Sequence, residues 1–281
     1  RGTNAEGTEG KTDPQMTQMY ADERRKLMEN SKIEWTDHTF NPWWGCQHAG
    51  SPGCDNCYAQ AFARRCGIDC FGPGKPRRVF GEKHWAAPLK WNRAAEKAGK
   101  RAIVFSGSMC DIFEPVEMWS ERWRLYDLIG RTPHLFWLLL TKRPENIGKM
   151  RPPHGFPENV GLGVTVETQA QMWRIHRMLE FEASVYFVSH EPALGAVKWP
   201  DDFMELGQRA WLITGYESGP HAREIHPEIA EIDRDQSQAA GVPYFFKQWG
   251  DGFCCPGLNG RLLGNRIWDE YPPILRQPCS K

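Results

Sequence analysis

Short apolar runs, separated by longer amphipathic stretches, constrain the fold of this chain more than any other feature. The runs have strand length and are rich in β-branched and aromatic residues; they cover residues 32–36, 101–106, 134–141, 159–167, 184–189, 211–215 and 244–248. Apolar residues at helical spacing predict helices over 54–66, 116–130, 168–181 and 225–241. Continuous apolar strands that alternate with helices are typical of a parallel sheet. We therefore expect an α/β fold, a partial or complete (βα)6–7 barrel.

One domain accounts for the whole chain. Its 281 residues contain no internal repeat and no Pro/Gly-rich linker. Residues 1–30 are polar without an apolar period, which predicts a flexible or partly helical segment. The barrel should occupy residues 31–250, and residues 251–281 should form a C-terminal extension packed on it. We find neither a signal peptide nor a run of bilayer length, so we expect a cytoplasmic monomer without membrane contact.

Three cysteines follow the first predicted strand with the spacing Cys46-x₇-Cys54-x₂-Cys57. They stand on one glycine-containing loop that leads directly into a predicted helix. Three thiolates can bind three irons of a four-iron cluster and leave the fourth iron open to a small molecule. Backbone N–H groups at the start of the following helix can donate to such an anionic cluster. We therefore favour an iron–sulfur cluster at these cysteines.

A structural zinc ion remains the alternative for this loop. Zinc would need a fourth ligand, for which His48, Cys66 and Cys70 are the nearest candidates. The other cysteines, Cys110, Cys254, Cys255 and Cys279, receive no assigned role. Clustered cysteines without a secretory signal more often bind metal than form disulfides.

Ionisable and hydroxyl side chains follow the predicted strands. They are Ser106, Ser108, Asp111, Lys142, Arg143, Thr165, Glu167, His190, Glu191, Glu217 and Lys247. Each has a structural explanation too, because such residues also cap helices and form turns. Since the ends of barrel strands meet at one rim, their number together favours a common site for a polar, charged ligand.

Ordered motifs in the chain resemble the radical S-adenosylmethionine (SAM) superfamily, and within it the phage three-cysteine-motif proteins. The motifs are FNPWWGC at 40–46, SPGCDNCYA at 51–59, SMCDIF at 108–113, LTKRPE at 140–145, EP at 191–192, ESGP at 217–220 and FFKQWG at 245–250. The usual superfamily signature is C-x₃-C-x₂-C. This chain lengthens the first gap to seven residues and keeps the C-x₂-C end.

The resemblance implies that Cys46, Cys54 and Cys57 hold a [4Fe-4S] cluster and that S-adenosylmethionine binds the open iron. One electron, from a reductase or a flavodoxin-type donor, would cleave SAM to methionine and a 5′-deoxyadenosyl radical. By position in the motifs, the residues expected to bind SAM are Asn56 and Tyr58 near the adenine, Ser106, Ser108 and Asp111 near the methionine, and Thr165 and Glu167 near the ribose.

The resemblance also suggests a substrate, a modified thymidine in bacteriophage DNA. The implied reaction is an isomerisation, in which a glycyl group bound to the thymine methyl carbon through nitrogen becomes bound through its α-carbon. Lys142, Arg143 and Lys247 could bind the glycyl carboxylate. His190, Glu191 and Glu217 could handle its protons.

Access to DNA is a separate requirement. A base inside DNA must be flipped out or single-stranded to reach a barrel mouth. The formal net charge is zero, so no overall field attracts nucleic acid. A local basic groove could form from Arg64, Arg65, Lys75, Arg77 and Arg78.

Two alternative functions remain open from the sequence. The first is a radical SAM DNA-repair lyase of the photoproduct type, for which Cys110 is the only rim cysteine that could donate hydrogen. The second is a zinc-bound nucleic-acid-binding module without catalysis.

Overall fold

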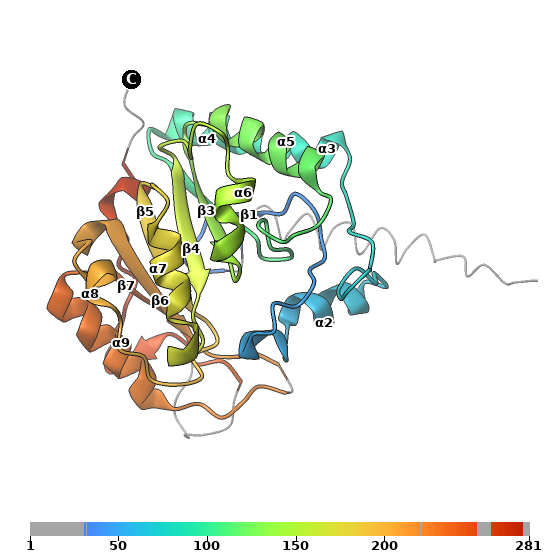
Figure 1. The fold of residues 1–281 in the computed structure, drawn as a ribbon. Coiled ribbons are helices and arrows are strands. Elements are labelled where there is room, and N and C mark those ends of the chain that lie inside the picture. The colour runs from blue at the N-terminus through green and yellow to red at the C-terminus, as the bar shows by residue number, and fades with distance from the viewer. Residues whose placement is uncertain (1–30, 32, 220, 252–259, 278–281) are drawn as a thin grey trace, which may run out of the picture.

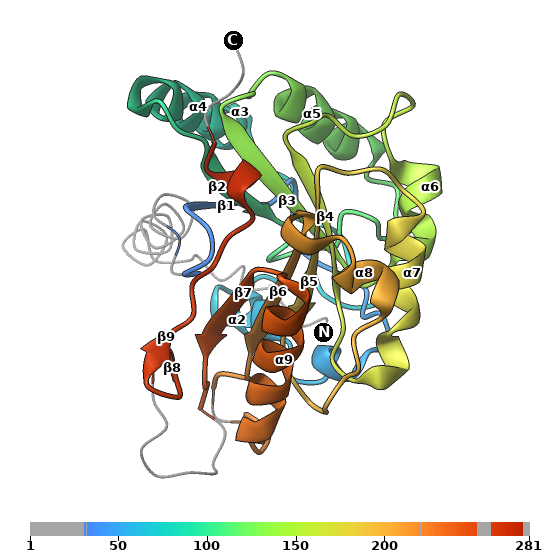
Figure 2. The same ribbon diagram turned by 90° about the vertical axis from the view of Figure 1, so that its left-hand side faces the viewer.

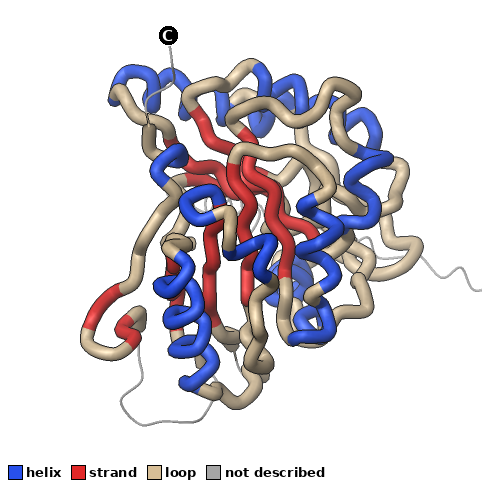
Figure 3. Tube along the Cα trace, turned by 60° about the vertical axis from the view of Figure 1, so that its left-hand side comes forward, coloured by secondary structure: helices blue, strands red, loops and turns tan. Residues whose placement is uncertain are grey.

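A single curled sheet organises the computed structural model, which describes residues 31, 33–219, 221–251 and 260–277. The sheet has seven parallel strands in the order of the chain (Figure 1). They are β1 (His38–Phe40), β2 (Ala102–Ser106), β3 (Leu135–Thr141), β4 (Val160–Thr165), β5 (Val185–His190), β6 (Ala210–Gly215) and β7 (Tyr244–Gln248). Helices lie around the outside of the sheet (Figure 3). The predicted barrel is confirmed in its partial form.

The first strand is the one that the sequence misplaced. The other strands overlap their predicted runs, but residues 32–36 form a turn instead of β1. In this turn the Thr36 N–H donates to the Ile33 carbonyl at 3.1 Å, and the Thr36 hydroxyl donates to the Ile103 carbonyl at 3.0 Å. The apolar residues of the run pack in the barrel interior, where Trp35 is 1% exposed. Apolar character there reflects burial and not strand pairing.

The predicted helices are present with shorter bounds. They are α2 (Tyr58–Arg65), α5 (Trp119–Gly130), α7 (Trp173–Leu179) and α9 (Pro227–Ala240). The sequence missed α3 (Glu82–Trp85), α4 (Ala87–Ala98), α6 (Ile147–Met150) and α8 (Asp201–Met204). In α4 only Pro88, Trp91 and Ala95 are buried, a stripe too narrow to stand out in the sequence. No helix in the described ranges combines the length and apolar composition needed to cross a membrane.

Short elements complete the chain. The 3₁₀ turns are η1 (Pro52–Cys54), η2 (Pro144–Asn146), η3 (Gln169–Gln171), η4 (Gly207–Arg209) and η5 (Pro273–Leu275). A small antiparallel hairpin joins β8 (Leu262–Leu263) to β9 (Arg266–Ile267).

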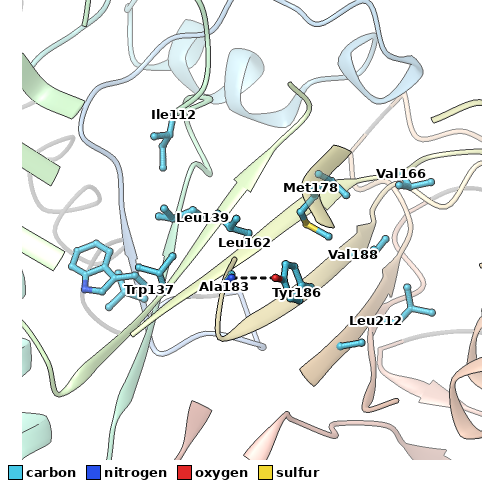
Figure 4. Close-up of a cluster of buried hydrophobic side chains, with 14 of the residues drawn as sticks. Ile112, Trp137, Leu139, Leu162, Val166, Met178, Ala183, Tyr186, Val188 and Leu212 are labelled. Atoms are coloured by element: carbon cyan, nitrogen blue, oxygen red, sulfur yellow. Dashed lines mark hydrogen bonds between the residues drawn. The ribbon is translucent and has the colours of Figure 1, made fainter. Parts of the chain in front are cut away.

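Each strand separates two cores, because successive side chains point to opposite faces. Toward the helices, Leu139, Leu162 and Val188 pack in one large cluster, part of which Figure 4 shows. Toward the barrel interior, a second cluster contains Trp35, Phe105, Phe187, Trp211 and Phe245. The interior face of β4 carries glycine because a Cβ atom at Gly163 would lie 2.3 Å from the ring of Phe187. Large aromatic rings from neighbouring strands therefore fill the part of the barrel interior that these residues line.

The C-terminal segment closes one end of the barrel. After β9 the chain runs along the edge of β7 toward the start of β1 and β2 (Figure 2). The Phe246 N–H donates to the Trp268 carbonyl at 2.9 Å, and Arg276 pairs with Asp37, which precedes β1, at 2.6 Å. Leu275 is fully buried in the interior core. The polar residues that the sequence singled out lie at the other end, where the strands finish.

Candidate functional site

A cavity of about 430 Å³ lies at the C-terminal ends of the strands. Its base reaches the aromatic interior at Trp35 and Phe105. Its mouth contains most of the polar residues that the sequence singled out: Cys46, Cys54, Asn56, Cys57, Tyr58, Ser108, Asp111, Lys142, Arg143, Thr165, Glu191, Glu217 and Lys247. The strands therefore bring side chains from distant parts of the chain to one site, as the barrel predicts.

Two predicted site residues point to the wrong face of the sheet. Strand alternation turns Ser106 and His190 toward the helices, and both are fully buried. His190 Nδ1 lies 2.6 Å from Asp233 Oδ2 of α9, and the Thr214 hydroxyl donates to the same oxygen at 2.7 Å. The proton-handling role expected of His190 and the SAM contact expected of Ser106 are therefore wrong. The sequence analysis treated all polar residues at a strand end as facing the same site, whereas successive side chains of a strand point to opposite faces of the sheet.

We divide the charged residues at the mouth into two groups. The early rim follows β2, β3 and β4 and comprises Asp111, Glu114, Lys142, Arg143 and Glu167. The late rim follows β5, β6 and β7 and comprises Glu191, Glu217 and Lys247. The cysteine loop, residues 46–57, contacts both groups.

Glu114 of the early rim holds the start of the cysteine loop. Its carboxylate is fully buried and accepts from the Gln47 N–H and from Arg77 Nε at 3.1 Å. Arg77 Nη2 pairs with it at 2.7 Å, with the two side chains 5% and 0% exposed. Buried charges require such partners. Arg77 is thus committed to the loop, and its expected place in a DNA groove is wrong.

Arg143 and Asp111 form the second anchor. Arg143 Nη1 lies 3.2 Å from Asp111 Oδ2 and 3.7 Å from Cys46 Sγ, and Nη2 donates to the Gln47 carbonyl. Asp111 also accepts from the Thr141 hydroxyl at 2.7 Å and from the Lys142 N–H at 3.1 Å. The ends of β2 and β3 are therefore joined to each other and to the first cysteine.

Glu167 forms the third anchor, under the middle of the loop. Its fully buried carboxylate accepts from Ser51 at 2.5 Å and pairs with Lys142 at 3.0 Å and Arg174 at 2.9 Å. A Cβ atom at Gly53 would lie 2.7 Å from Glu167 Oε1, so the loop passes directly over the acid. Burial raises the pKa of Glu167. The two cations and the Ser51 hydroxyl lower it by more than this, so the pKa is below its usual value. Glu167 thus supports the loop from outside the cavity, and the expected ribose contact is wrong.

The late rim is organised differently. Glu191 Oε1 and Lys247 Nζ lie 2.7 Å apart, with the two side chains 14% and 23% exposed, and both face the cavity. Ser189 donates to the other oxygen of Glu191 at 3.1 Å. Unlike the early-rim acids, this pair contacts no residue of the cysteine loop in the described interactions.

Glu217 joins the late rim to the far end of the cysteine loop. It pairs with Arg223 and accepts from Asn56 Nδ2 at 3.2 Å, while Arg223 Nη2 donates to the Pro52 carbonyl at 2.9 Å. Burial raises the pKa of Glu217, but the bonds from Arg223 and Asn56 outweigh it and lower the pKa. An acid held ionised in this way is poorly suited to the proton transfer that the sequence suggested.

The three cysteines of the loop share one cavity. Cys46, Cys54 and Cys57 are free thiols that line the same cavity. No three His, Cys, Asp or Glu side chains in the described part of the chain converge as ligands of a single ion. A zinc site needs four ligands around one ion, whereas the thiolates of a cluster each bind a different iron.

Burial raises the pKa of Cys46 to about 12, with Asp111 and Glu114 adding to the effect. Burial likewise raises the pKa of Cys57, the residue immediately before α2. Such thiols lose their proton when a metal ion takes its place. The donor set and its position beneath a helix start therefore fit an iron–sulfur cluster.

Of the other expected basic-groove residues, three are engaged, among them Arg65, whose guanidinium lies 5.7 Å from the centre of the Phe62 ring. Lys75 pairs with Asp69 at 2.5 Å, and the Arg78 guanidinium lies 5.3 Å from the centre of the Trp44 ring. Arg64 and Arg65 are exposed on α2. Cys110 is buried and packs in the helix-side core, but it also lines the cavity, and its Sγ lies 3.7 Å from Asn41 Oδ1. Cys254, Cys255 and Cys279 lie outside the described residues.

The anchors of the loop were missed by the sequence analysis. Ser51 lies inside a quoted motif and Glu114 directly follows one, but neither position carries a local signal of contact with the cysteine loop. Arg77, Arg174 and Arg223 pair with acids brought near only by folding. Ser189 could have been found, because alternation along β5 places it on the same face as Glu191.

Comparison with known proteins places the chain in a family. Residues 30–272 match the model of a family described as protein of unknown function, DUF5131. The chain belongs to this family. The DUF5131 match includes the cysteine loop and both rims. A search of curated protein sequences finds no match.

Solved structures similar to this DUF5131 protein share its fold. A cysteine-to-serine mutant of spore photoproduct lyase has a TM-score of 0.53 and 13% identity, covering 86% of this chain and 88% of that chain. Spore photoproduct lyase complexed with dinucleoside spore photoproduct has a TM-score of 0.51 and 13% identity, with the same shares covered. The DUF5131 chain thus shares the partial-barrel fold of spore photoproduct lyase. At this identity the likeness concerns the fold alone.

Proposed function

We propose that this chain is a radical SAM enzyme that acts on a modified thymine base in DNA. The observation that carries the proposal is the placement of three free cysteines on one loop, all lining one cavity at the mouth of a parallel partial barrel. Cys46, Cys54 and Cys57 would each bind one iron of a [4Fe-4S] cluster, with SAM at the fourth iron. When bound, these cofactors supply a 5′-deoxyadenosyl radical by one-electron cleavage of SAM.

The residues beside the cysteine loop are assigned to SAM. Asn56, Tyr58, Ser108 and Thr165 line the cavity next to the cysteines. The Tyr58 hydroxyl donates to the Ser108 carbonyl at 2.8 Å, which fixes the end of the loop against the end of β2. Lys142 lines the same cavity as Cys57, and its positive charge acts to lower the pKa of that thiol. We assign Lys142 to the carboxylate of SAM instead of the substrate.

The Glu191–Lys247 pair is assigned to the substrate. A glycyl group bound through nitrogen carries an amine and a carboxylate a few bonds apart, and this pair offers the complementary acid and base. Glu191 would accept the amine proton while Lys247 holds the carboxylate. In the reaction a hydrogen atom leaves the glycyl α-carbon, the thymine methylene moves from nitrogen to that carbon, and a hydrogen atom returns. No atom is lost, so the product is an isomer.

The thymine base would enter from the mouth. The opposite end is closed by the C-terminal segment around Leu275 and Arg276. The apolar base of the cavity at Trp35 and Phe105 offers rings against which a base can stack. A base reaches such a depth only when it is flipped out or single-stranded. A reductase or flavodoxin-type protein in the cytoplasm would supply the electron.

Anaerobic assay tests the proposal. The reconstituted protein is incubated with reductant, SAM and DNA that contains N-glycyl thymidine, and the nucleosides are then separated by chromatography. We expect 5′-deoxyadenosine formation and a new nucleoside of unchanged mass, neither of which Cys57→Ala produces. Cleavage of SAM without a changed nucleoside would remove the thymidine substrate, and a wild-type protein without iron and sulfide would remove the enzyme class.

Repair of a thymine photoproduct is the second candidate. It is favoured by the fold shared with spore photoproduct lyase, which has been solved with dinucleoside spore photoproduct. Cys110 would have to donate hydrogen; it lines the cavity, and its Sγ lies 3.7 Å from Asn41 Oδ1. The same assay with photoproduct-containing DNA decides between the two. Release of thymidine that is lost in Cys110→Ala would establish repair in place of isomerisation.

A further inference from the structure

We propose that Arg143 is a positioning residue for the cluster, and that its guanidinium raises the reduction potential of the cluster at the Cys46 corner. This inference rests on the proposed function, because it concerns the iron–sulfur cluster assigned to Cys46, Cys54 and Cys57. It replaces the substrate-binding role that the sequence suggested for Arg143.

The guanidinium contacts two successive residues of the cysteine loop. Nη1 lies 3.7 Å from Cys46 Sγ, and Nη2 donates to the carbonyl of Gln47. Arg143 is held from behind as well, since its backbone N–H donates to the Thr141 hydroxyl at 2.8 Å. Because both the backbone and the planar guanidinium of Arg143 are held by other residues, the guanidinium can fix the position of the Cys46 sulfur.

Little of Arg143 is left for a substrate. Its side chain is 9% exposed and that of its partner Asp111 is 7% exposed. The neighbouring cation, Lys142, points instead to Glu167 at 3.0 Å and is 22% exposed. The Lys-Arg pair is therefore divided: the lysine lies closer to solvent, and the arginine is committed to the loop.

A cation at this position favours the reduced cluster. Reduction adds one negative charge, and hydrogen bonds to the cysteine sulfurs are among the factors that set the potential of an iron–sulfur cluster. The guanidinium contacts both Cys46 Sγ and Asp111 Oδ2, so it stands between the cluster site and a buried carboxylate. Removing it would take away the donor and leave the charge of Asp111 unbalanced. Both changes make reduction harder.

The neighbouring cation, Arg77, does not compensate for the loss, because it pairs with Glu114. The Glu114 carboxylate is occupied by Arg77 at 2.7 Å and by the Gln47 N–H. The two early-rim ion pairs near Cys46 therefore act separately, and only the Arg143 pair includes a contact to the sulfur.

Three variants test the inference: Arg143→Gln, Arg143→Lys and the control Arg131→Gln. Arg131 is exposed and pairs only with Asp127 in the described ion pairs, at 3.1 Å, so its replacement changes net charge equally. Each protein is reconstituted anaerobically with iron and sulfide, and its midpoint potential is measured by a redox titration followed by electron paramagnetic resonance. We expect a shift to more negative potential for Arg143→Gln, a smaller shift for Arg143→Lys, and none for the control.

A second measurement uses the metal-free proteins. Hydrogen exchange of the Gln47 amide should be faster in Arg143→Gln than in wild type or the control, because the loop loses an anchor. An Arg143→Gln protein with a full cluster, wild-type potential and wild-type exchange would overturn the inference alone. A wild-type protein that holds no iron and sulfide would overturn the proposed function and this inference with it.

Discussion

The two halves of the barrel mouth use the same residue types for different purposes. In the early rim, Glu114 and Glu167 are fully buried, and each accepts hydrogen bonds both from the cysteine loop and from arginine. In the late rim, Glu191 and Lys247 are partly exposed and pair with each other beside the cavity. Charges satisfied on every side hold structure, whereas a pair open to a cavity can exchange partners. The early rim thus holds the cysteine loop in place, whereas the Glu191–Lys247 pair of the late rim is open to the cavity.

Loss of a loop cysteine should have the largest effect. Replacing Cys46, Cys54 or Cys57 by serine removes one of three iron ligands, so we expect loss of the cluster and of SAM cleavage. Iron and sulfide content and visible absorbance measure the result. The control Cys66→Ser lies outside the cavity lining and should keep the cluster. Equal iron content in all four variants would mean that the loop does not bind the cluster.

Glu114→Gln tests the structural role of the early rim. The change leaves Arg77, 5% exposed, without its counter-charge. Removing one partner of a buried ion pair costs about 3–5 kcal/mol, which denaturant unfolding of the metal-free protein would show. The control Glu82→Gln breaks an ion pair in which the glutamate side chain is 85% exposed and should cost below about 1 kcal/mol. Equal losses in both variants would contradict the distinction between buried and open charges.

Glu191→Gln tests the functional role of the late rim. We expect the rate of substrate conversion to fall by about 10²–10⁴-fold, since the variant loses its proton acceptor. Unfolding free energy should fall by only about 1 kcal/mol, because one hydrogen-bonded contact is weakened. Steady-state rates and denaturant unfolding give the two numbers. A variant that loses stability and keeps its rate would place Glu191 with the early rim.

Acid titration of the early rim should have the smallest effect. The pKa of Glu167 is lower in the folded protein than its usual value. Such a group stabilises the fold at pH above its unfolded pKa, about 4.3, and this stability is lost as pH falls through the folded pKa. The contribution of ionised Glu167 to stability is measured from the unfolding free energies of metal-free wild type and Glu167→Gln between neutral and acidic pH. The two curves should converge at low pH; parallel curves would show that Glu167 is not perturbed.

The fold was predictable because its signal is local. Strand-length apolar runs such as 134–141 and 184–189 carry the sheet, since a strand buried on both faces must be apolar throughout. The exception, residues 32–36, shows the limit: apolar residues report burial, and Trp35 is buried from a turn. The three cysteines were likewise visible, because their spacing is a property of one loop.

The sequence alone indicated most of the charges that gather at the mouth; tertiary structure added Glu114, removed His190 and decided what each of the others contacts. His190 and Glu191 are neighbours, yet the pleat buries one against Asp233 and turns the other into the cavity. Ser51 and Glu167, 116 residues apart, meet only because the cysteine loop, which follows β1, reaches the end of β4 in the folded chain. Desolvation is the physical reason: a charge removed from water must find its partner among whatever side chains the fold brings near.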